Sequence, residues 1–124
     1  MTMHLMLLCL LLSASATANA GAADATGRWK VTISLGGETI TGVSLLKQSG
    51  DEITGSIGAD ERNQHPLDGV VRANHITLTT HPRPGRTVAF DTCELNVDGD
   101  KMTGTTERKG SSDKGNIEFV RMKE

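Results

Sequence analysis

The chain has few aromatic side chains and little cysteine or proline. One Trp, two Phe and no Tyr occur among 124 residues, with two Cys and three Pro. Aromatic rings on which bases could stack are therefore scarce, and the formal net charge of −2 provides no basic excess to neutralise phosphates. We therefore expect no nucleic acid among the partners of this protein.

Long apolar runs are also absent, except at the N-terminus. Residues 4–12 are mostly Leu and Met, and the small residues that follow end in Ala18-Asn19-Ala20. Such a run with an A-x-A exit is typical of a secretory signal and is too short to span a membrane. We expect a signal peptide over residues 1–20, cleavage near Ala20, a secreted or periplasmic protein and no membrane span.

Cleavage there removes Cys9 and leaves Cys93 as the lone cysteine, so no internal disulfide is expected. We interpret Cys93 as a small buried apolar residue, and an intermolecular bridge or a reactive thiol is the alternative. Residues 21–26 are small and predict a disordered N-terminal tail. Residues 27–122 then predict one domain.

Apolar residues in this domain alternate with polar ones, which is the period of a half-buried strand, and helical periodicity is absent. Gly, Asn, Asp and Pro separate the alternating segments and indicate turns or loops. Adjacent apolar residues at Leu45 and Leu46 predict a bulge or a shift of face, and the change of face near Asp91 and Thr92 predicts a bulge. The expected strands cover residues 29–35, 38–48, 52–58, 66–71, 75–80, 86–97, 101–107 and 116–122.

An internal repeat favours a closed sheet. Residues 50–56, Gly-Asp-Glu-Ile-Thr-Gly-Ser, match residues 99–105, Gly-Asp-Lys-Met-Thr-Gly-Thr. In each copy alternation directs the second Gly inward, at Gly55 and Gly104, where a missing side chain permits a sharp bend or leaves room inside. Repeated bends are what barrel closure requires. The sequence therefore predicts an all-β, eight-stranded antiparallel up-and-down β-barrel, with a two-sheet β-sandwich as the alternative.

The motifs Gly27-Arg28-Trp29, residues 50–56 and Pro66-Leu67-Asp68-Gly69 resemble the start of avidin-type barrels. With a final Glu118-Phe119-Val120-Arg121 strand, the chain resembles more closely a set of uncharacterised small bacterial secreted domains, within the wider avidin-like and lipocalin-like (calycin) barrels. The resemblance covers nearly all of residues 27–121 and implies the fold rather than an activity. Avidins hold biotin with several Trp and a Tyr, which this chain lacks, so biotin is not the expected ligand.

The order of the strands predicts where binding occurs. In a meander barrel, alternate connections lie at the same end, so the three short turns close one end and the long loops form an open rim at the other. Rigid scaffolds commonly bind through such loops, and barrel mouths are frequent ligand sites. The simpler alternative is that charged loops only keep the protein soluble. The candidate binding residues on or beside the rim are Arg62, His65, His81, Arg83, Arg86, Arg108 and Lys109.

Two functions fit such a rim. One is a non-enzymatic binding module that holds a small molecule or an anionic group at the mouth. The other is a protein-interaction module, because small periplasmic barrel inhibitors of proteases resemble this architecture. Trp29, at the start of the first strand, is interpreted as core at the closed end, with a place in a ligand wall as the alternative.

Residues with catalytic chemistry do not form a recognisable pattern. Ser111-Ser112-Asp113-Lys114 matches S-x-x-K, but in the hydrolases that use this motif the Ser opens a helix inside a large domain. His65 and His81 lack the spacing of a paired metal motif. We therefore predict no catalytic residue, no metal site and no cofactor.

Overall fold

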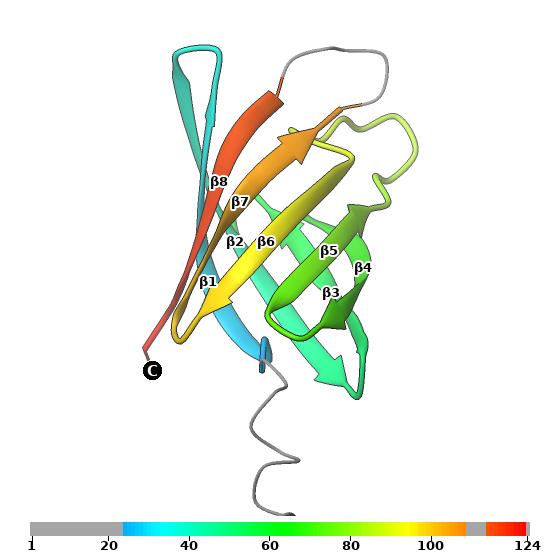
Figure 1. Ribbon diagram of the computed structural model, residues 1–124. Coiled ribbons are helices and arrows are strands. Elements are labelled where there is room, and N and C mark those ends of the chain that lie inside the picture. Colours follow the sequence, from blue (N-terminus) through cyan, green and yellow to red (C-terminus); the bar gives the residue numbers. More distant parts are fainter. Residues whose placement is uncertain (1–23, 109–113, 124) are drawn as a thin grey trace, which may run out of the picture.

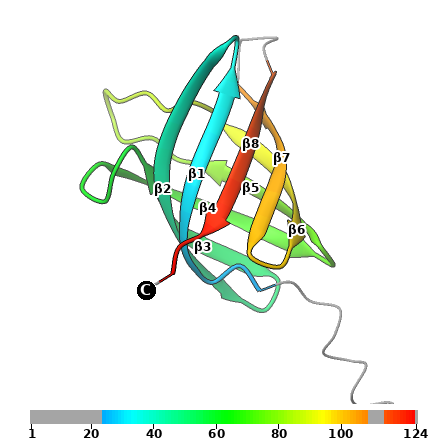
Figure 2. The same cartoon turned by 90° about the vertical axis from the view of Figure 1, so that its left-hand side faces the viewer.

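Eight antiparallel strands close into a barrel in the computed structural model, which describes residues 24–108 and 114–123 (Figure 1). Each strand pairs with the next in the sequence, and the first and last strands pair to complete the ring (Figure 2). No helix in the described ranges is long and apolar enough to cross a membrane. The strands are β1 (Gly27–Leu35), β2 (Glu38–Ser49), β3 (Glu52–Gly58), β4 (Gln64–Arg72), β5 (His75–Thr80), β6 (Thr92–Asp98), β7 (Lys101–Glu107) and β8 (Lys114–Arg121).

The all-β barrel expected from the sequence is therefore confirmed, and the two-sheet sandwich is excluded. Seven strands lie within two residues of their expected bounds, because period-two alternation marks where the chain faces a core on one side only. The expected signal peptide, residues 1–20, lies outside the described residues, as do the N-terminal positions up to residue 23.

The start of the sixth strand is the main error of the sequence prediction. Residues 86–91 were expected in it, but pairing with β5 begins only at Thr92, opposite Thr79. β5 ends at Thr80, whose N–H bonds to the carbonyl oxygen of Asp91, so no residue of β5 lies beside residues 86–90 to pair with them. Phe90 is buried without belonging to a strand, and Val88 and Ala89 before it are both half-buried, so the segment does not alternate as a strand would. The bulge expected near Asp91 is absent for the same reason.

The bulge or shift of face expected at Leu45 and Leu46 is also wrong. The register between β1 and β2 runs without a break from Gly27 opposite Leu46 to Leu35 opposite Glu38, and β2 meets β3 equally regularly. Leu46 faces the core, whereas Leu45 lies half-buried on the outer face. Adjacent apolar residues therefore reflect one apolar side chain on each face of the strand.

The repeated inward glycines lie where neighbouring strands approach too closely for any side chain. A Cβ at Gly55 would lie 2.0 Å from the carbonyl oxygen of Leu45, and a Cβ at Gly104 would lie 1.6 Å from that of Glu94. Only a hydrogen atom fits in such a gap, so these glycines permit the strong coiling that closes a small sheet. Of the two roles that the sequence suggested for them, the structure shows the bend.

Three of the four short connections close the lower end of the barrel, and the fourth, Gly36-Gly37, lies at the other end. Gly50, Ala73 and Gly99 adopt positive φ values of 63°, 55° and 64° in the turns between β2 and β3, β4 and β5, and β6 and β7. Such backbone conformations suit tight turns and are most easily adopted by glycine. The long connections emerge at the opposite end, which fixes the site of the open mouth.

Trp29 fills the closed end as a core residue. Its side chain is fully buried, and its indole N–H donates to the carbonyl oxygen of Ala25 at 2.9 Å. The ring meets Phe119 edge to face, with the ring centres 6.3 Å apart. Both polar and apolar parts of the indole are therefore satisfied within the core.

Residues 24–26 pack against this end, although the sequence suggested a disordered tail up to residue 26. Ala25 is fully buried, and its backbone N–H donates to Oε1 of Gln48 at 2.9 Å. Arg121, at the end of β8, donates from its guanidinium to the carbonyl oxygens of Thr26 and Asp24. These bonds hold the segment, which we call the N-terminal strap, across the closed end.

Candidate functional site at the barrel mouth

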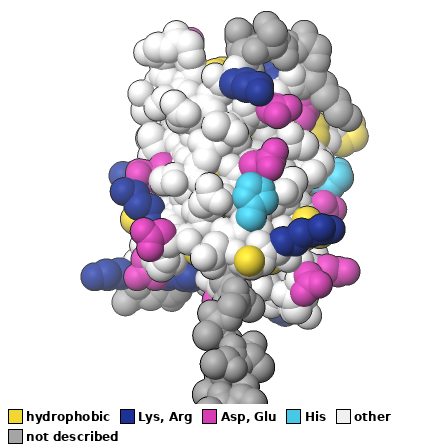
Figure 3. Space-filling view, in the orientation of Figure 1, with side chains coloured by type: hydrophobic (Ala, Val, Ile, Leu, Met, Phe, Trp, Pro, Cys, Tyr) yellow, Lys and Arg dark blue, Asp and Glu magenta, His cyan; other side chains and the backbone are white. Residues whose placement is uncertain are grey.

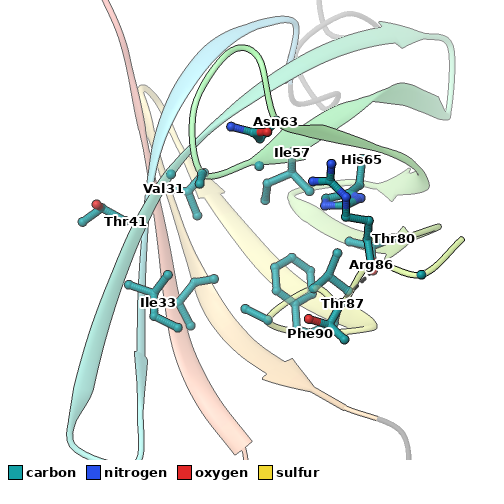
Figure 4. A pocket seen from close by; sticks show the side chains of 17 residues that line it. Val31, Ile33, Thr41, Ile57, Asn63, His65, Thr80, Arg86, Thr87 and Phe90 are labelled. Carbon is teal, nitrogen blue, oxygen red and sulfur yellow. Dashed lines mark hydrogen bonds between the residues drawn. The ribbon is translucent and has the colours of Figure 1, made fainter. Parts of the chain in front are cut away.

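A cavity of about 490 Å³ opens at the end opposite Trp29 (Figure 4). It lies between the upper parts of β1 and β2, the end of β3 with the loop that follows, and the extended segment 85–90. Volumes of this size are typical of small-ligand sites. The lining residues are Val31, Ile33, Ile40, Thr41, Gly42, Ile57, Gly58, Ala59, Asn63, His65, Thr80, Gly85, Arg86, Thr87, Val88, Ala89 and Phe90.

The inner wall of the cavity is apolar. Val31 and Ile33 face it from β1, Ile57 from β3, and Phe90 from the segment before β6. Ile40, near the tip of the β1–β2 hairpin, has 41% of its surface exposed although its position in the alternation directs it inward. Water therefore reaches Ile40 at the mouth, whereas Ile33, Ile57 and Phe90 on the inner wall are buried. A ligand that covered Ile40 would gain the free energy of apolar burial.

Polar side chains gather on one side of this apolar wall. Figure 4 shows Arg86 and His65 close together, whereas Thr41, on the opposite side, points its side chain away from the cavity. His65 is buried, and its Nδ1 accepts the backbone N–H of Arg83 at 3.4 Å. Arg86 is the one permanently charged side chain among the described lining residues, and none of these is a carboxylate.

The segment that carries Arg86 is fastened to the end of β5 where it leads into β6. The hydroxyl of Thr80 donates to the carbonyl oxygen of Phe90 at 2.8 Å, and the backbone N–H of Thr80 donates to that of Asp91 at 2.9 Å. Within the loop, the N–H of Arg86 donates to the carbonyl oxygen of Arg83 at 3.0 Å. These bonds position the guanidinium-bearing segment beside the cavity.

The loop from β3 to β4 is ordered by one carboxylate. Oδ1 of Asp60 accepts the backbone N–H of Arg62 at 2.9 Å and that of Asn63 at 3.0 Å. These bonds hold the pKa of the Asp60 carboxyl below its usual value. The N–H of Arg62 has the largest effect, and the side chain and N–H of Asn63 add to it. This cluster places Asn63 at the edge of the cavity.

Gln64 fastens the same loop to the strands below it. Its side-chain N–H group donates to the carbonyl oxygens of Asp60 at 2.7 Å and Val43 at 3.1 Å, and its Oε1 accepts the hydroxyl of Ser56 at 2.6 Å. Arg28 forms an ion pair with Glu61 on the outer surface. The loop therefore has a defined position beside the mouth.

The structure brings two of the eight candidate residues to the cavity, His65 and Arg86. Arg62, Arg83, His81 and Arg108 have exposed side chains outside its lining, and Nε2 of His81 lies 3.0 Å from a carboxylate oxygen of Asp68. Trp29 lies in the core at the far end. Lys109 falls outside the described residues, as do residues 111–113 of the Ser-x-x-Lys pattern.

The apolar lining was not among the residues singled out from the sequence. Alternation identifies Val31, Ile33 and Ile57 as inward-facing. Because alternate connections lie at the same end of the barrel, the strand ends that carry these residues point toward the mouth. Combining these two signals would have found the wall. The contribution of Phe90 was hidden, because it was assigned to a strand that does not extend that far.

A second hollow, of about 510 Å³, lies on the outer wall over β1, β8, β7 and β6. Its side chains are mainly short and uncharged, and Figure 3 shows this broad white surface between the charged groups. Lacking the apolar wall of the mouth, it offers less for a ligand to bury. Its lining residues are Thr32, Ser34, Asn96, Thr103, Gly104, Thr105, Asn116, Ile117 and Glu118.

No group of three or more His, Cys, Asp or Glu side chains in the described ranges is arranged to hold a metal ion. The chain matches no family model. A search of curated proteins likewise found no match. The site must therefore be interpreted from its own geometry.

Proposed function

We propose that this protein is a secreted, non-enzymatic binding module that holds a small ligand with an apolar body and an anionic group in the barrel mouth. The observation that carries the proposal is the cavity of about 490 Å³, with an apolar inner wall and Arg86 as its permanently charged side chain. Secretion rests on the leader pattern of residues 1–20.

The charge of the lining supports an anion rather than a cation. A bound carboxylate or sulfonate would meet the Arg86 guanidinium, which can donate two parallel hydrogen bonds to such a group. A bound cation would meet no carboxylate among the described lining residues. The apolar part of the ligand would cover the exposed Ile40 and lie against Ile33, Ile57 and Phe90 on the inner wall.

The fold supports a further part of the proposal, that the barrel is related to the avidin-like and lipocalin-like types that its motifs resemble. Closed eight-stranded barrels of this size have room for one small ligand. The aromatic walls that hold biotin in avidins have no counterpart here, since Trp29 lies at the closed end. The ligand class therefore follows from the mouth and not from the resemblance.

Binding of 8-anilinonaphthalene-1-sulfonate, followed by its fluorescence, tests this function. The probe combines an apolar ring system with a sulfonate. Decanoate should displace it, and decanol should displace it at least about tenfold less well. The alcohol lacks the charge-assisted bond to Arg86, and a loss of about 1.4 kcal/mol corresponds to tenfold in affinity. Equal displacement by the acid and the alcohol would remove the anionic part of the proposal.

Arg86→Gln and Arg83→Gln form a matched pair of variants for this test. Both remove one exposed Arg charge from the same loop, but only Arg86 lines the cavity. Arg86→Gln should weaken decanoate binding about tenfold, and Arg83→Gln should leave it within about twofold. The same loss in both variants would indicate attraction to a charged rim rather than a site. Failure of the probe to bind the native protein would refute the function.

A further inference from the structure

The upper part of β2 has a strand on one side only. Its pairing with β1 continues up to Glu38, opposite Leu35, whereas its pairing with β3 stops at Val43, opposite Gly58. No other described strand pairs with residues 38–42 on that second side. Five residues of β2 therefore form an edge within an otherwise closed barrel.

The register shows which backbone groups lie along this edge. Both hairpins of β2 have two-residue turns, closed by the pairs Leu35–Glu38 and Ser49–Glu52. Because hydrogen-bonding direction alternates along an antiparallel strand, even-numbered residues of β2 bond to β1 and odd-numbered ones face the β3 side. The N–H and C=O groups of Thr39 and Thr41 therefore point away from β1, where the described pairing provides no strand.

This edge borders the cavity. Ile40, Thr41 and Gly42 all contribute to the lining, and residues 38–41 are exposed. Beyond Gly58, the chain leaves the line of β3 and enters the loop ordered by Asp60. The space that a longer β3 would occupy beside Thr39 and Thr41 is therefore the opening of the cavity itself (Figure 4).

We propose that this edge and the cavity together bind the C-terminal end of an extended peptide, which adds a short strand beside β2. This inference rests on the proposed function and deepens it, because a peptide ending in an apolar residue carries both an apolar group and a carboxylate. Addition of a strand to an exposed sheet edge is a general mode of peptide recognition, with affinity from backbone bonds and specificity from side-chain pockets.

Charge selects the end of the peptide that enters. A terminal carboxylate inside the mouth meets Arg86, whereas a terminal ammonium would meet no carboxylate in the described lining. The rest of the peptide leaves through the rim, beside the β1–β2 hairpin. Since β2 runs from the rim at Glu38 inward, a peptide that enters with its carboxyl end first lies parallel to β2.

The apolar wall selects the side chain. In an added strand, alternate side chains point toward the barrel axis, where Ile33, Ile40 and Phe90 line the cavity. A peptide whose final residue is Val, Leu, Ile or Phe would cover these groups, and one ending in a charged residue would bury its charge without an opposing group.

Selection from a random octapeptide library displayed with free carboxyl ends tests the proposal on the full-length mature protein. We expect enrichment of apolar final residues. A selected peptide, made synthetically, should lose at least about tenfold in affinity when its carboxylate is converted to the amide. Failure to enrich any sequence, or enrichment that is indifferent to amidation, would overturn the inference.

N-methylation of the selected peptide tests the backbone pairing without altering the protein. Methyl groups on the amides of one alternating set should abolish binding, because those N–H groups face β2. Methyl groups on the other set should leave affinity within about threefold, because those amides face away from β2. Equal loss from both sets would exclude strand addition.

The variants Thr41→Pro and Thr41→Val test the same bond from the protein side. Proline removes the N–H of residue 41 at a position where an edge strand tolerates it, whereas valine retains the N–H and the shape of the side chain. Peptide affinity should fall about tenfold in the first variant and stay within about twofold in the second. Anilinonaphthalene sulfonate provides the folding and cavity control. If the native protein binds the probe but no peptide, the inference about the β2 edge is rejected and the proposed function stands. If it binds neither, the proposed function is rejected as well.

Discussion

The guanidinium of Arg121 lies over the indole ring of Trp29, with its central carbon 4.3 Å from the ring centre. These residues come from the last and first strands, which pair to close the barrel. The same guanidinium bonds to the carbonyl oxygens of Thr26 and Asp24 and, at 2.8 Å, to a carboxylate oxygen of Asp100. One side chain thus joins the strap, the closure seam and the turn between β6 and β7.

Replacement of Arg121 should therefore destabilise the closed end. Arg121→Met keeps much of the stem that covers Trp29 but removes the cation and its hydrogen bonds, and we expect the free energy of unfolding to fall by about 2 kcal/mol. Urea titration measures the loss, and emission from Trp29, the only Trp in the chain, reports directly on this end.

Arg72→Met provides the control for that prediction. Arg72 ends β4 and is exposed, and its replacement should change the free energy of unfolding by less than about 0.5 kcal/mol. If both variants lost the same stability, the effect would come from net charge and not from the contact with Trp29.

The inward glycines should be irreplaceable. Gly55→Ala places a methyl group 2.0 Å from the carbonyl oxygen of Leu45, so the backbone must move, and we expect a loss of about 3 kcal/mol in the free energy of unfolding. Thermal and urea unfolding measure it. Gly36→Ala is the matched comparison, because its φ is 57° but no atom lies within 4 Å of the added carbon. It should lose only about 1 kcal/mol, from the left-handed backbone. Equal losses at the two sites would contradict the steric explanation.

Cys93 should be inert toward alkylation in the folded protein. Burial raises the pKa of its thiol to about 12, so little thiolate forms at neutral pH. Iodoacetamide followed by mass spectrometry should modify it only as fast as the barrel opens. Rapid modification without urea would show that the thiol is accessible.

The same thiol should make stability fall at high pH. The folded pKa is raised above the ordinary thiol value of 9.0, so the unfolded chain releases this proton first. The stabilisation is complete below about pH 9 and is lost between about pH 9 and pH 12, at up to about 1.4 kcal/mol per pH unit. Cys93→Ala should show a correspondingly flatter pH profile in this window. Parallel profiles would contradict the assignment.

Asp60 should titrate at a lower pH than an ordinary aspartate. Its pKa is held down chiefly by the N–H of Arg62, with Asn63 adding to the effect. Carboxyl NMR titration should place the midpoint below 3.8, and Asn63→Ala should return it part of the way toward that value. Because the folded pKa is lowered, the bonds stabilise the loop above the ordinary pKa and are lost as the pH falls through the folded value. A midpoint unchanged by Asn63→Ala would show that its amide does not act on the carboxylate.

Much of the fold was predictable because local signals agreed with one another. Alternation identified the strands, Gly-Asp turns such as Gly50-Asp51 separated them, and the inward Gly55 and Gly104 indicated closure. Each of these signals involves residues near one another in the sequence. The continuous register of β2 was obscured because Leu45 is apolar on the outer face.

The mouth was harder to predict because it depends on where strands stop pairing. Nothing local to Arg86 or Phe90 distinguishes a strand from an extended cover, and the difference arises from β5 ending at Thr80. The edge at Thr39 and Thr41 likewise results from β3 being shorter than β2. Arg62 and Arg83 lie on the expected loops, but the direction of a loop side chain depends on tertiary contacts that the sequence pattern does not encode.

The strap has a practical consequence for measuring recognition. Asp24 and Arg121 are held together at the closed end, and Met122 donates its backbone N–H to the carbonyl oxygen of Arg28 at 2.8 Å. Both termini of the described barrel therefore depart from the pole opposite the cavity. An affinity handle or surface tether joined beyond either terminus would leave the mouth facing solution, so immobilised protein should retain full access for probe and peptide.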